Sequence, residues 1–342
     1  MSMKTIKRFV TLFVDKDTCI VARGYRLYHY DPKTNRLRYF SRIEDRRNSW
    51  LSCFSLTRRL FRAEITHLYH FQNDIWMCIA KKAIFRYNPE SKLFEKGCDI
   101  EKGSRPMNLC QAKNGTIYYG EYCNNPLRKP MRIFQSKDNG TTWTVAYTFA
   151  EGEINHIHGI FHDPYTDRLW VATGDVDEAC IFGYTEDGFK TLVRQYEGTQ
   201  QYRVCVPLFT KKEIIFATDS QYEQNYIRSI NRETGEVKNL QAIQGSGIYA
   251  VQNGNLMMVS TTVEPSKVNL DNRSHLWYSF NGHDWKELIS FKKDIWKKTY
   301  FQFGSIRFPH YESESDYAVF TGRALSGLDG KTKVVPINSL IV

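Results

Sequence analysis

The feature that most constrains the fold is a repeated unit of roughly 45–50 residues, a period typical of propellers and other repeat arrays. Each unit begins with a short apolar run, makes a tight polar turn and continues in a second apolar run, as in RVCVPLF-TKK-EIIFATDS. Short apolar runs separated by such turns predict antiparallel strands. Seven units of four strands predict an all-β, seven-bladed β-propeller forming a single domain over residues 1–342. A six-bladed propeller is the alternative, because the seventh unit is irregular.

Composition agrees with this prediction and narrows the class of protein. Aromatic residues make up 14% of the chain, and such residues favour strands. The N-terminal apolar run from Phe9 to Val14 is shorter than the core of a signal peptide, and no stretch approaches the length of a spanning helix. We therefore expect a cytoplasmic protein without a membrane span. None of the eight Cys forms a CxxC pair, so buried thiols are expected rather than a disulfide or zinc framework.

The net charge of +10 favours anionic partners, although the same charge also serves solubility. Lys and Arg are spread along the chain, and no nucleic-acid-binding motif is present. We therefore expect no nucleic acid among the partners. The oligomeric state is left open.

One short motif separates the third and fourth predicted strands of several units. Its full copy is Ser136-Lys-Asp138-Asn-Gly140-Thr-Thr-Trp143, and shortened copies occur around Asn281 and Asp187. It resembles the Asp-box, or BNR, repeat of sialidase-like propellers. The resemblance implies a structural hairpin and a carbohydrate context. Those sialidases also carry a Phe/Tyr-Arg-Ile-Pro motif, which this chain lacks, so sialidase activity is not expected.

Charged and titratable residues recur where a propeller exposes its ligand-binding face, at the start of each first strand and the end of each second strand. Those predicted at strand starts are Arg62, His67, Arg105, His156, His158, Arg203 and Arg307. Those predicted at strand ends are Arg23, Glu121, Tyr122, Asp175, Asp177, Asp219 and Arg323. Polar residues are common at strand ends in general, so the alternative is a solvated rim.

The densest group is in the fourth unit, where His156 and His158 are two residues apart. On a strand this spacing directs both side chains to the same face. The pair is a candidate for binding a divalent metal together with Asp175 or Asp177. The alternatives are one His acting as a general base, or two histidines with purely structural hydrogen bonds.

Two further groups suit chemistry on an acidic sugar. Glu121 and Tyr122 pair a carboxylate with a phenol, which suits acid–base or nucleophilic catalysis, or else a structural ion pair. Arginines such as Arg62, Arg105 and Arg203 can hold a carboxylate through two hydrogen bonds each, or else form salt bridges between blades.

The sequence therefore predicts a protein that acts on an acidic oligosaccharide or polysaccharide. One hypothesis is a glycoside hydrolase that uses Glu121 with Asp175 or Asp177. Another is a lyase in which arginines or a metal neutralise a uronate carboxylate, and a His or Tyr122 removes the proton at C5. The alternative from another class is a noncatalytic glycan-binding or scaffold propeller in polysaccharide synthesis or processing.

Overall fold

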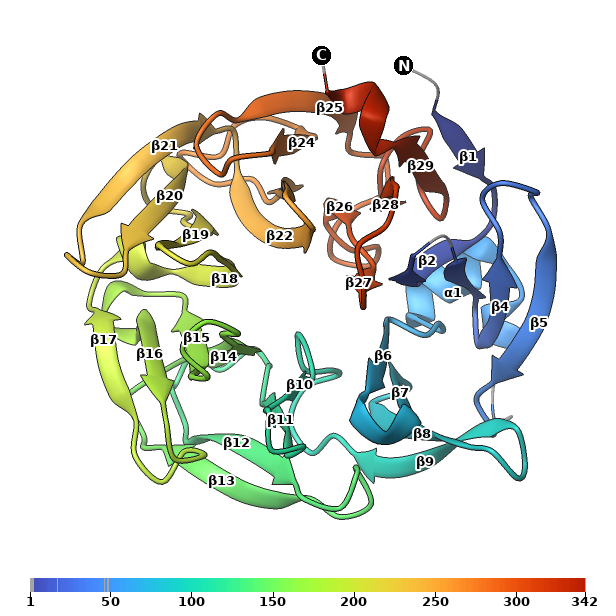
Figure 1. Ribbon diagram of the computed structural model, residues 1–342, viewed down its shortest axis with the longest axis horizontal. Helices are drawn as coiled ribbons and strands as arrows, with labels where there is room; N and C mark the ends of the chain where they lie inside the picture. The colour runs from blue at the N-terminus through green and yellow to red at the C-terminus, as the bar shows by residue number, and fades with distance from the viewer. Residues whose placement is uncertain (1–2, 17, 46, 48, 342) are drawn as a thin grey trace. The chain divides into compact units, whose positions relative to one another are not determined.

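The protein is an all-β propeller in which successive strands pair to form antiparallel sheets (Figure 1). The structure, a computed structural model, describes residues 3–16, 18–45, 47 and 49–341. The chain divides into two compact units. Unit 1 comprises Met1–Lys96, Val251–Glu264 and Asn272–Val342, and unit 2 comprises Gly97–Ala250 and Pro265–Asp271. The expectation of a single domain over residues 1–342 stays a prediction.

Unit 2 contains three four-stranded sheets, and each follows the chain order of its strands. The first consists of β10 (Cys110–Gln111), β11 (Ile117–Gly120), β12 (Met131–Ser136) and β13 (Thr144–Phe149). The second consists of β14 (His156–His162), β15 (Leu169–Gly174), β16 (Ile181–Thr185) and β17 (Val193–Glu197). The third consists of β18 (Val204–Phe209), β19 (Glu213–Thr218), β20 (Asn225–Asn231) and β21 (Val237–Ile243). Short 3₁₀ turns η3 (Asp177–Ala179) and η4 (Gln200–Tyr202) flank the second sheet.

Two sheets are built mainly from the N-terminal part of unit 1, although the last residues of β9 belong to unit 2. The first contains β2 (Val10–Asp15), β3 (Thr18–Arg23), β4 (Arg26–Tyr30) and β5 (Leu37–Arg42), with β27 (His310–Tyr311) added in parallel beside β2. The second contains β6 (His67–Phe71), β7 (Ile75–Ala80), β8 (Ala83–Asn88) and β9 (Leu93–Asp99). The 3₁₀ turn η2 (Gln72–Asp74) connects β6 to β7.

The remaining strands form one eight-stranded sheet. It contains β22 (Ser246–Asn253), β23 (Leu256–Val263), β24 (Arg273–Ser279), β25 (Lys286–Lys292), β26 (Gly304–Arg307), β28 (Tyr317–Arg323), β29 (Thr332–Pro336) and β1 (Lys4–Ile6). The N-terminal strand β1 pairs with β29, and the 3₁₀ turn η5 (Ile337–Leu340) follows β29.

The blade count predicted from the sequence is wrong. In the described residues, five separate sheets of four or five strands accompany the eight-stranded sheet, so there are neither seven nor six separate blades. The sixth and seventh repeats share a sheet because β23 pairs with β26 at Thr262–Ser305 and Val263–Gly304. The sequence marks where strands begin and end, but it does not show this lateral pairing.

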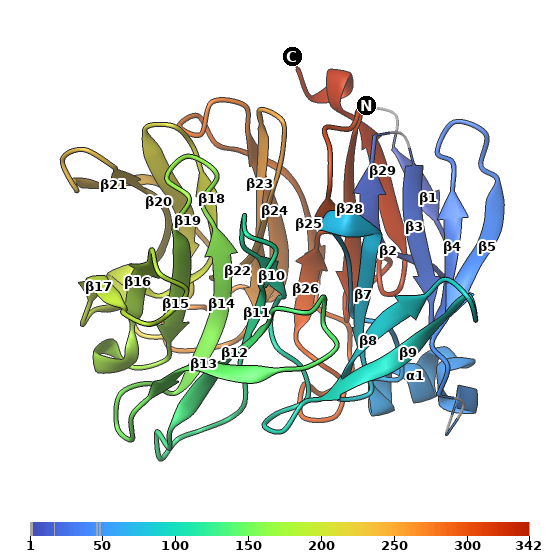
Figure 2. The ribbon, with the colours of Figure 1, turned by 60° about the horizontal axis from the view of Figure 1, so that its bottom comes forward.

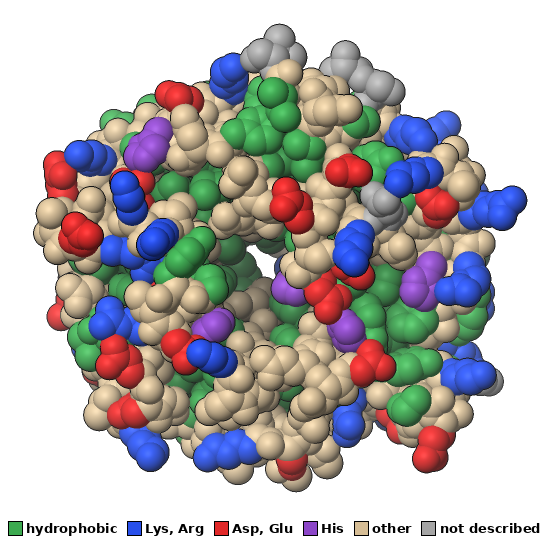
Figure 3. Space-filling model, viewed as in Figure 1, with side chains coloured by type: hydrophobic (Ala, Val, Ile, Leu, Met, Phe, Trp, Pro, Cys, Tyr) green, Lys and Arg blue, Asp and Glu red, His purple; other side chains and the backbone are tan. Residues whose placement is uncertain are grey.

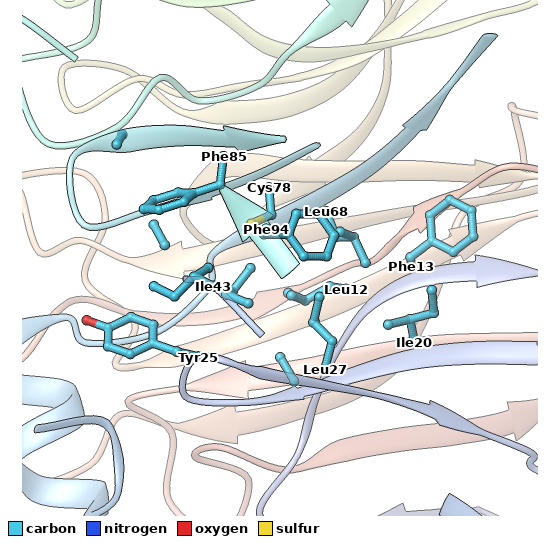
Figure 4. Close-up of a cluster of buried hydrophobic side chains, with 14 of the residues drawn as sticks. Leu12, Phe13, Ile20, Tyr25, Leu27, Ile43, Leu68, Cys78, Phe85 and Phe94 are labelled. Atoms are coloured by element: carbon cyan, nitrogen blue, oxygen red, sulfur yellow. The ribbon is translucent and has the colours of Figure 1, made fainter. Parts of the chain in front are cut away.

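A large buried cluster of unit 1 lies between its two N-terminal sheets (Figure 4). Leu12 and Leu27 come from one sheet, whereas Leu68 and Phe85 come from the other, and each is almost fully buried. Burying one such side chain contributes about 1.5–3 kcal/mol. The apolar alternation in the sequence therefore reflects sheet faces that are buried against each other.

A short helical segment lies between two strands, and the repeat pattern did not predict it. The 3₁₀ turn η1 (Ser49–Ser52) and helix α1 (Ser55–Phe61) connect β5 to β6, beyond the hairpin that joins β3 to β4 (Figure 2). Gly24 in that hairpin has φ of 62°, and a Cβ there would lie 2.7 Å from Cβ of Ser52. Among the described residues, no helix is long and apolar enough to cross a bilayer.

The motif at Ser136–Trp143 forms the predicted hairpin, between β12 and β13. Oδ1 of Asp138 accepts hydrogen bonds from Oγ of Ser136 at 2.8 Å and from the backbone N–H of Thr142 at 2.9 Å. Gly140 adopts φ of 82°, which favours glycine. The turns at Asp187 and Asn281 repeat the bond to the residue two positions earlier, at 2.8 and 3.0 Å. The motif is structural, whereas membership of the Asp-box family stays a prediction.

Replacing Asp138 with Ala is expected to lower the free energy of unfolding by about 1 kcal/mol, the net value of hydrogen bonds of this kind. These hydrogen bonds, the one from the Thr142 hydroxyl first among them, lower the pKa of Asp138 from 3.8 to about 2. Since the folded-state pKa is depressed, the stabilisation is present above pH 3.8 and is lost as the pH falls towards 2. Urea unfolding at pH 7 and at acid pH measures both effects. Lys137→Ala, an exposed neighbour, is the control; equal losses in both variants would contradict the structural role.

Candidate functional site

A β-bulge in unit 2 positions the two histidines. His156 is the first residue of β14 and pairs with Gly174 at the end of β15, so the two strand ends meet as predicted. The register shifts between Ile157 and Gly159, which leaves His158 as the extra residue. A bulge turns a side chain away from simple alternation and is frequent beside functional sites. A second register shift, between Val204 and Pro207, occurs in the adjacent strand β18.

Backbone carbonyl groups determine which ring nitrogen carries the proton in both histidines. Nδ1 of His156 lies 3.2 Å from the carbonyl oxygen of Cys123, and Nδ1 of His158 lies 2.7 Å from that of Val204. A carbonyl oxygen only accepts, so Nδ1 donates and the lone pair of each neutral ring is on Nε2. Histidines that bind metals are commonly oriented in this way.

Both histidines are neutral at pH 7. Burial, reinforced by the neighbouring His158, lowers the pKa of His156 to about 4. Burial likewise lowers the pKa of His158, which is 2% exposed. The two rings lie 5.1 Å apart between centroids. Neutral imidazole is the form that binds a metal or accepts a proton.

Asp175 is held beside the histidines in a strained backbone conformation. Its φ of 148° lies in a region that is essentially restricted to glycine and costs about 1–3 kcal/mol. Arg203 stabilises this conformation: Nη1 donates to the backbone carbonyl of Asp175 at 3.1 Å and Nη2 to its Oδ1 at 2.9 Å. Gln200 donates to the same carbonyl at 3.0 Å. Strain maintained by several partners is typical of functional positions.

Nε2 of His156, the ring nitrogen without a proton, lies near a carboxylate oxygen. Nε2 of His156 lies 3.5 Å from Oδ1 of Asp175, and with Nδ1 already donating, two acceptors face each other. At neutral pH no proton lies between these two atoms, because the pKa of His156 is about 4. Oδ1 of Asp175 already accepts a hydrogen bond from Arg203 at 2.9 Å, so a metal ion bound to Nε2 of His156 would share this carboxylate with Arg203. His156, His158 and Asp175 have candidate ligand atoms that all lie within 4.8 Å of one another.

A second group of candidate ligands overlaps the first through His158. It also contains Cys205 and Asp219, both buried, and Sγ of Cys205 lies 3.4 Å from Oδ2 of Asp219. Nη2 of Arg203 lies 3.3 Å from the same carboxylate oxygen. Arg203 therefore links Asp175 to Asp219 and compensates part of their charge.

Tyr122 lies against this cluster. Its ring meets that of His156 edge-on, with centroids 4.4 Å apart. Burial raises the pKa of Tyr122, and the charges of Cys205, Asp219 and Asp175 raise it further. The phenol is therefore protonated at neutral pH.

Two other predicted catalytic residues have partners of their own. Both carboxylate oxygens of Glu121 accept hydrogen bonds from Arg132, from its backbone at 2.8 Å and its Nη2 at 2.6 Å. Lys102 lies 3.6 Å from Glu121. Asp177 accepts a hydrogen bond from Gln200 at 2.9 Å. The structure therefore brings His156, His158, Asp175, Tyr122, Arg203 and Asp219 together, while Glu121 belongs to an ion-pair network with Arg132.

Among the predicted residues of unit 1, three lie at the predicted strand ends. Arg23 ends β3, His67 begins β6 and Arg323 ends β28. His67 contacts the Thr66 hydroxyl at 3.1 Å, and Arg323 forms a buried ion pair with Glu64. Arg323 and Glu64 line a small pocket together with Arg8 and Arg58.

Three predicted positions are wrong. Arg62 caps the C-terminus of helix α1 with φ of 52°, because the chain forms a helix before β6. Arg105 precedes β10, which begins only at Cys110, so it lies in a loop. Arg307 ends β26 instead of beginning it and donates from Nε to the Ser305 hydroxyl at 3.2 Å.

Sequence reasoning missed Cys205, Gln200 and Gly174. A Cβ on Gly174 would lie 2.5 Å from Cε1 of His158, so this glycine makes room for the ring. Its position opposite His156, at the end of RLWVATG, was a usable signal. Cys205 gave none, because buried thiols are common in strands. No disulfide links the cysteines that the structure describes.

Surface charge gives no sharper location for a ligand. On the face shown in Figure 3, Lys and Arg side chains are interspersed with Asp and Glu.

Comparison with known proteins supports the fold. No family model matches the chain, and no curated protein matches it. An oligogalacturonate lyase from Vibrio parahaemolyticus has a similar structure, with a TM-score of 0.62 at 10% identity, covering 97% of this chain and 91% of the lyase. An oligogalacturonate lyase in complex with manganese has a TM-score of 0.59 at 7% identity, covering 99% and 92%.

Similar structures also include other classes of protein. A GH74 enzyme from Niastella koreensis has a TM-score of 0.54 at 14% identity over 82% of this chain and 45% of its own. A chain of the mitotic checkpoint complex has a TM-score of 0.54 at 9% identity, covering 97% and 93%. At these identities the likeness shows the propeller fold, which is shared by carbohydrate-acting enzymes and by proteins of other kinds.

Proposed function

We propose that the cluster in unit 2 binds a divalent transition metal through His156, His158 and Asp175. The observation that carries this proposal is that candidate ligand atoms of His156, His158 and Asp175 all lie within 4.8 Å of one another, with Nε2 of His156 3.5 Å from Oδ1 of Asp175. Two neutral imidazoles and a carboxylate suit Zn²⁺, Mn²⁺ or Fe²⁺. The manganese complex of the similarly folded lyase supports a metal in this kind of propeller.

We further propose that the protein acts on an acidic glycan by β-elimination. When bound, the metal would neutralise the uronate carboxylate and so make the C5 proton more acidic. Because the histidines are the proposed ligands, a water molecule takes the C5 proton, a C4=C5 double bond forms, and the C4–O4 bond breaks with its electron pair on oxygen. We assign Tyr122 the protonation of the leaving oxygen, because its phenol is protonated at neutral pH and its ring lies against that of His156.

Hydrolysis has less support from this geometry. A glycoside hydrolase needs two carboxyl groups that both reach the scissile bond. Glu121 was the predicted partner of Asp175 or Asp177, but Arg132 engages both of its oxygens. Asp219 is buried and bonded to Arg203 and Cys205. Asp175 is thus the most accessible carboxylate of the cluster, with 38% of its side chain exposed.

Incubation with a panel of acidic oligosaccharides, with and without chelator, is expected to yield unsaturated fragments that chelator abolishes. Mass spectrometry separates these from hydrolysis products, which are heavier by one water. Tyr122→Phe is expected to lower the rate by about 10²–10⁴-fold, the usual contribution of a general acid. Products containing added water would overturn β-elimination in favour of hydrolysis.

A noncatalytic, glycan-binding role is the second candidate, because most of the cluster is closed to solvent. His158 is 2% exposed and Arg203 is 4% exposed. A metal in such a site can be purely structural. Unchanged oligosaccharides across the panel, together with a bound metal and measurable glycan binding, would favour this role in polysaccharide synthesis or processing.

A further inference from the structure

Helix α1 of unit 1 has the reverse of the usual burial pattern. Helices of globular proteins bury their apolar face and expose their charges. In α1 the buried residue is Arg59, whereas Leu56, Leu60 and Phe61 are 53%, 41% and 57% exposed. Leu56 and Leu60 are one turn apart, so they lie on the same side of the helix. Trp50 in the preceding segment is also exposed.

Arg59 fixes a second exposed segment beside the helix. Its Nη1 lies 2.7 Å from Oδ2 of Asp294, and its guanidinium lies over the ring of Phe301 at 5.3 Å. Trp296 packs on Phe301 with ring centroids 5.0 Å apart. Ile295, 93% exposed, flanks this contact. The buried ion pair thus holds two sets of exposed apolar side chains together within unit 1.

Both segments are strongly basic. Residues 49–62 contain three Arg and no acidic residue, and residues 292–300 contain four Lys and one Asp. The net charge of the two segments is therefore +6. The single acid of these segments, Asp294, pairs with Arg59 and Lys293, and Nη1 of Arg59 also lies 3.6 Å from Oδ2 of Asp329. Lys297 and Lys298 are exposed beside Trp296.

We propose that this apolar-basic surface, residues 49–62 with 292–300, docks the protein onto an anionic phospholipid bilayer. Exposed Trp, Phe, Leu and Ile side chains among Lys and Arg have the composition of segments that insert into the membrane interface. Each Lys or Arg near an anionic membrane surface adds to the electrostatic attraction. The excess of positive charge favours anionic lipid over a neutral apolar partner. This inference does not depend on the proposed enzymatic activity.

Vesicle flotation of the full chain tests the proposal. We expect binding to vesicles of equal parts phosphatidylcholine and phosphatidylglycerol, weakening as salt rises, and no binding to phosphatidylcholine alone. The double variant Leu56→Ser/Phe61→Ser and the double variant Lys297→Glu/Lys298→Glu are each expected to weaken binding at least about tenfold, since a tenfold loss corresponds to only about 1.4 kcal/mol. These side chains are exposed, so the variants should fold.

Leu127→Ser/Tyr222→Ser is the matched control, because both residues are exposed but belong to unit 2. Equal weakening in this control would overturn the assignment to the α1 surface. If the protein binds neither kind of vesicle, the proposal as a whole is overturned. If the protein then self-associates in sedimentation, and Leu56→Ser/Phe61→Ser abolishes that association, the surface is a protein interface instead.

Discussion

Replacing His158 with Ala is expected to abolish stoichiometric metal binding and to weaken the affinity for Zn²⁺ or Mn²⁺ by more than about 100-fold. Removing a residue that only hydrogen-bonds to a metal ligand already lowers metal affinity by about 10–100-fold. His158→Ala removes a proposed ligand itself, so the loss of affinity should be larger. His158 belongs to both groups of candidate ligands, so no alternative set around it survives the substitution. Metal analysis by mass spectrometry and titration of the metal-free protein provide the measurement.

The free energy of unfolding should also reveal metal binding, and this measurement needs no substrate. A metal that binds only the folded protein adds about 2.7 kcal/mol to the free energy of unfolding at 100 times its Kd. Wild-type protein should therefore gain stability on addition of metal, and His158→Ala should not.

His162→Ala is the matched control for this prediction. His162 ends the same strand, and its Nε2 lies 2.8 Å from Asp167, outside the cluster. Metal content and metal-dependent stability should remain unchanged in this variant. Unchanged metal content in His158→Ala, or equal loss in His162→Ala, would show that the metal site lies elsewhere.

The sequence predicted the propeller because each strand and hairpin is specified by residues within one repeat. Apolar runs and turn pairs specify strands and hairpins one unit at a time, and Asp138 and Gly140 specify their own turn through bonds within a few residues. Blade separation depends on lateral pairing, such as Val263 with Gly304, which no local pattern records. The sequence did not reveal helix α1, because it is only seven residues long and Leu56 and Leu60 mark a single turn of helical spacing.

The candidate site was predictable to the extent that it follows strand ends. His156, Asp175, Arg203 and Asp219 all lie where a first strand begins or a second strand ends. Alternation alone put His158 on the same side as His156, whereas in the structure it is the extra residue of a bulge. Glu121 and Tyr122 show the limit of the method. They are neighbours in sequence, yet Glu121 bonds to Arg132 while Tyr122 packs on His156.

Replacing Arg203 with Met is expected to lower the free energy of unfolding by about 3–5 kcal/mol, the usual cost of removing one partner of a buried ion pair. Arg203 is 4% exposed. It donates a hydrogen bond to Asp175 and lies 3.3 Å from Asp219. Its loss therefore leaves two neighbouring carboxylates without the positive charge that they share. It also removes two hydrogen bonds that maintain the strained backbone of Asp175. Urea unfolding of the metal-free protein measures the loss.

A second readout distinguishes this role from general stabilisation. Arg203 is one of the charges that lower the pKa of His156, so in Arg203→Met that pKa should rise above its value of about 4, as an NMR titration of the histidines would show. Arg232→Met is the control, because Arg232 makes a comparable buried ion pair with Asp163 in the same unit, away from the histidines. It should lose stability while the pKa of His156 stays unchanged. A His156 pKa that moves equally in both variants would mean that Arg203 acts only through the fold. A pKa that rises in Arg203→Met alone would place its charge in the electrostatics of the site, where a bound metal and Arg203 compete for the same carboxylate.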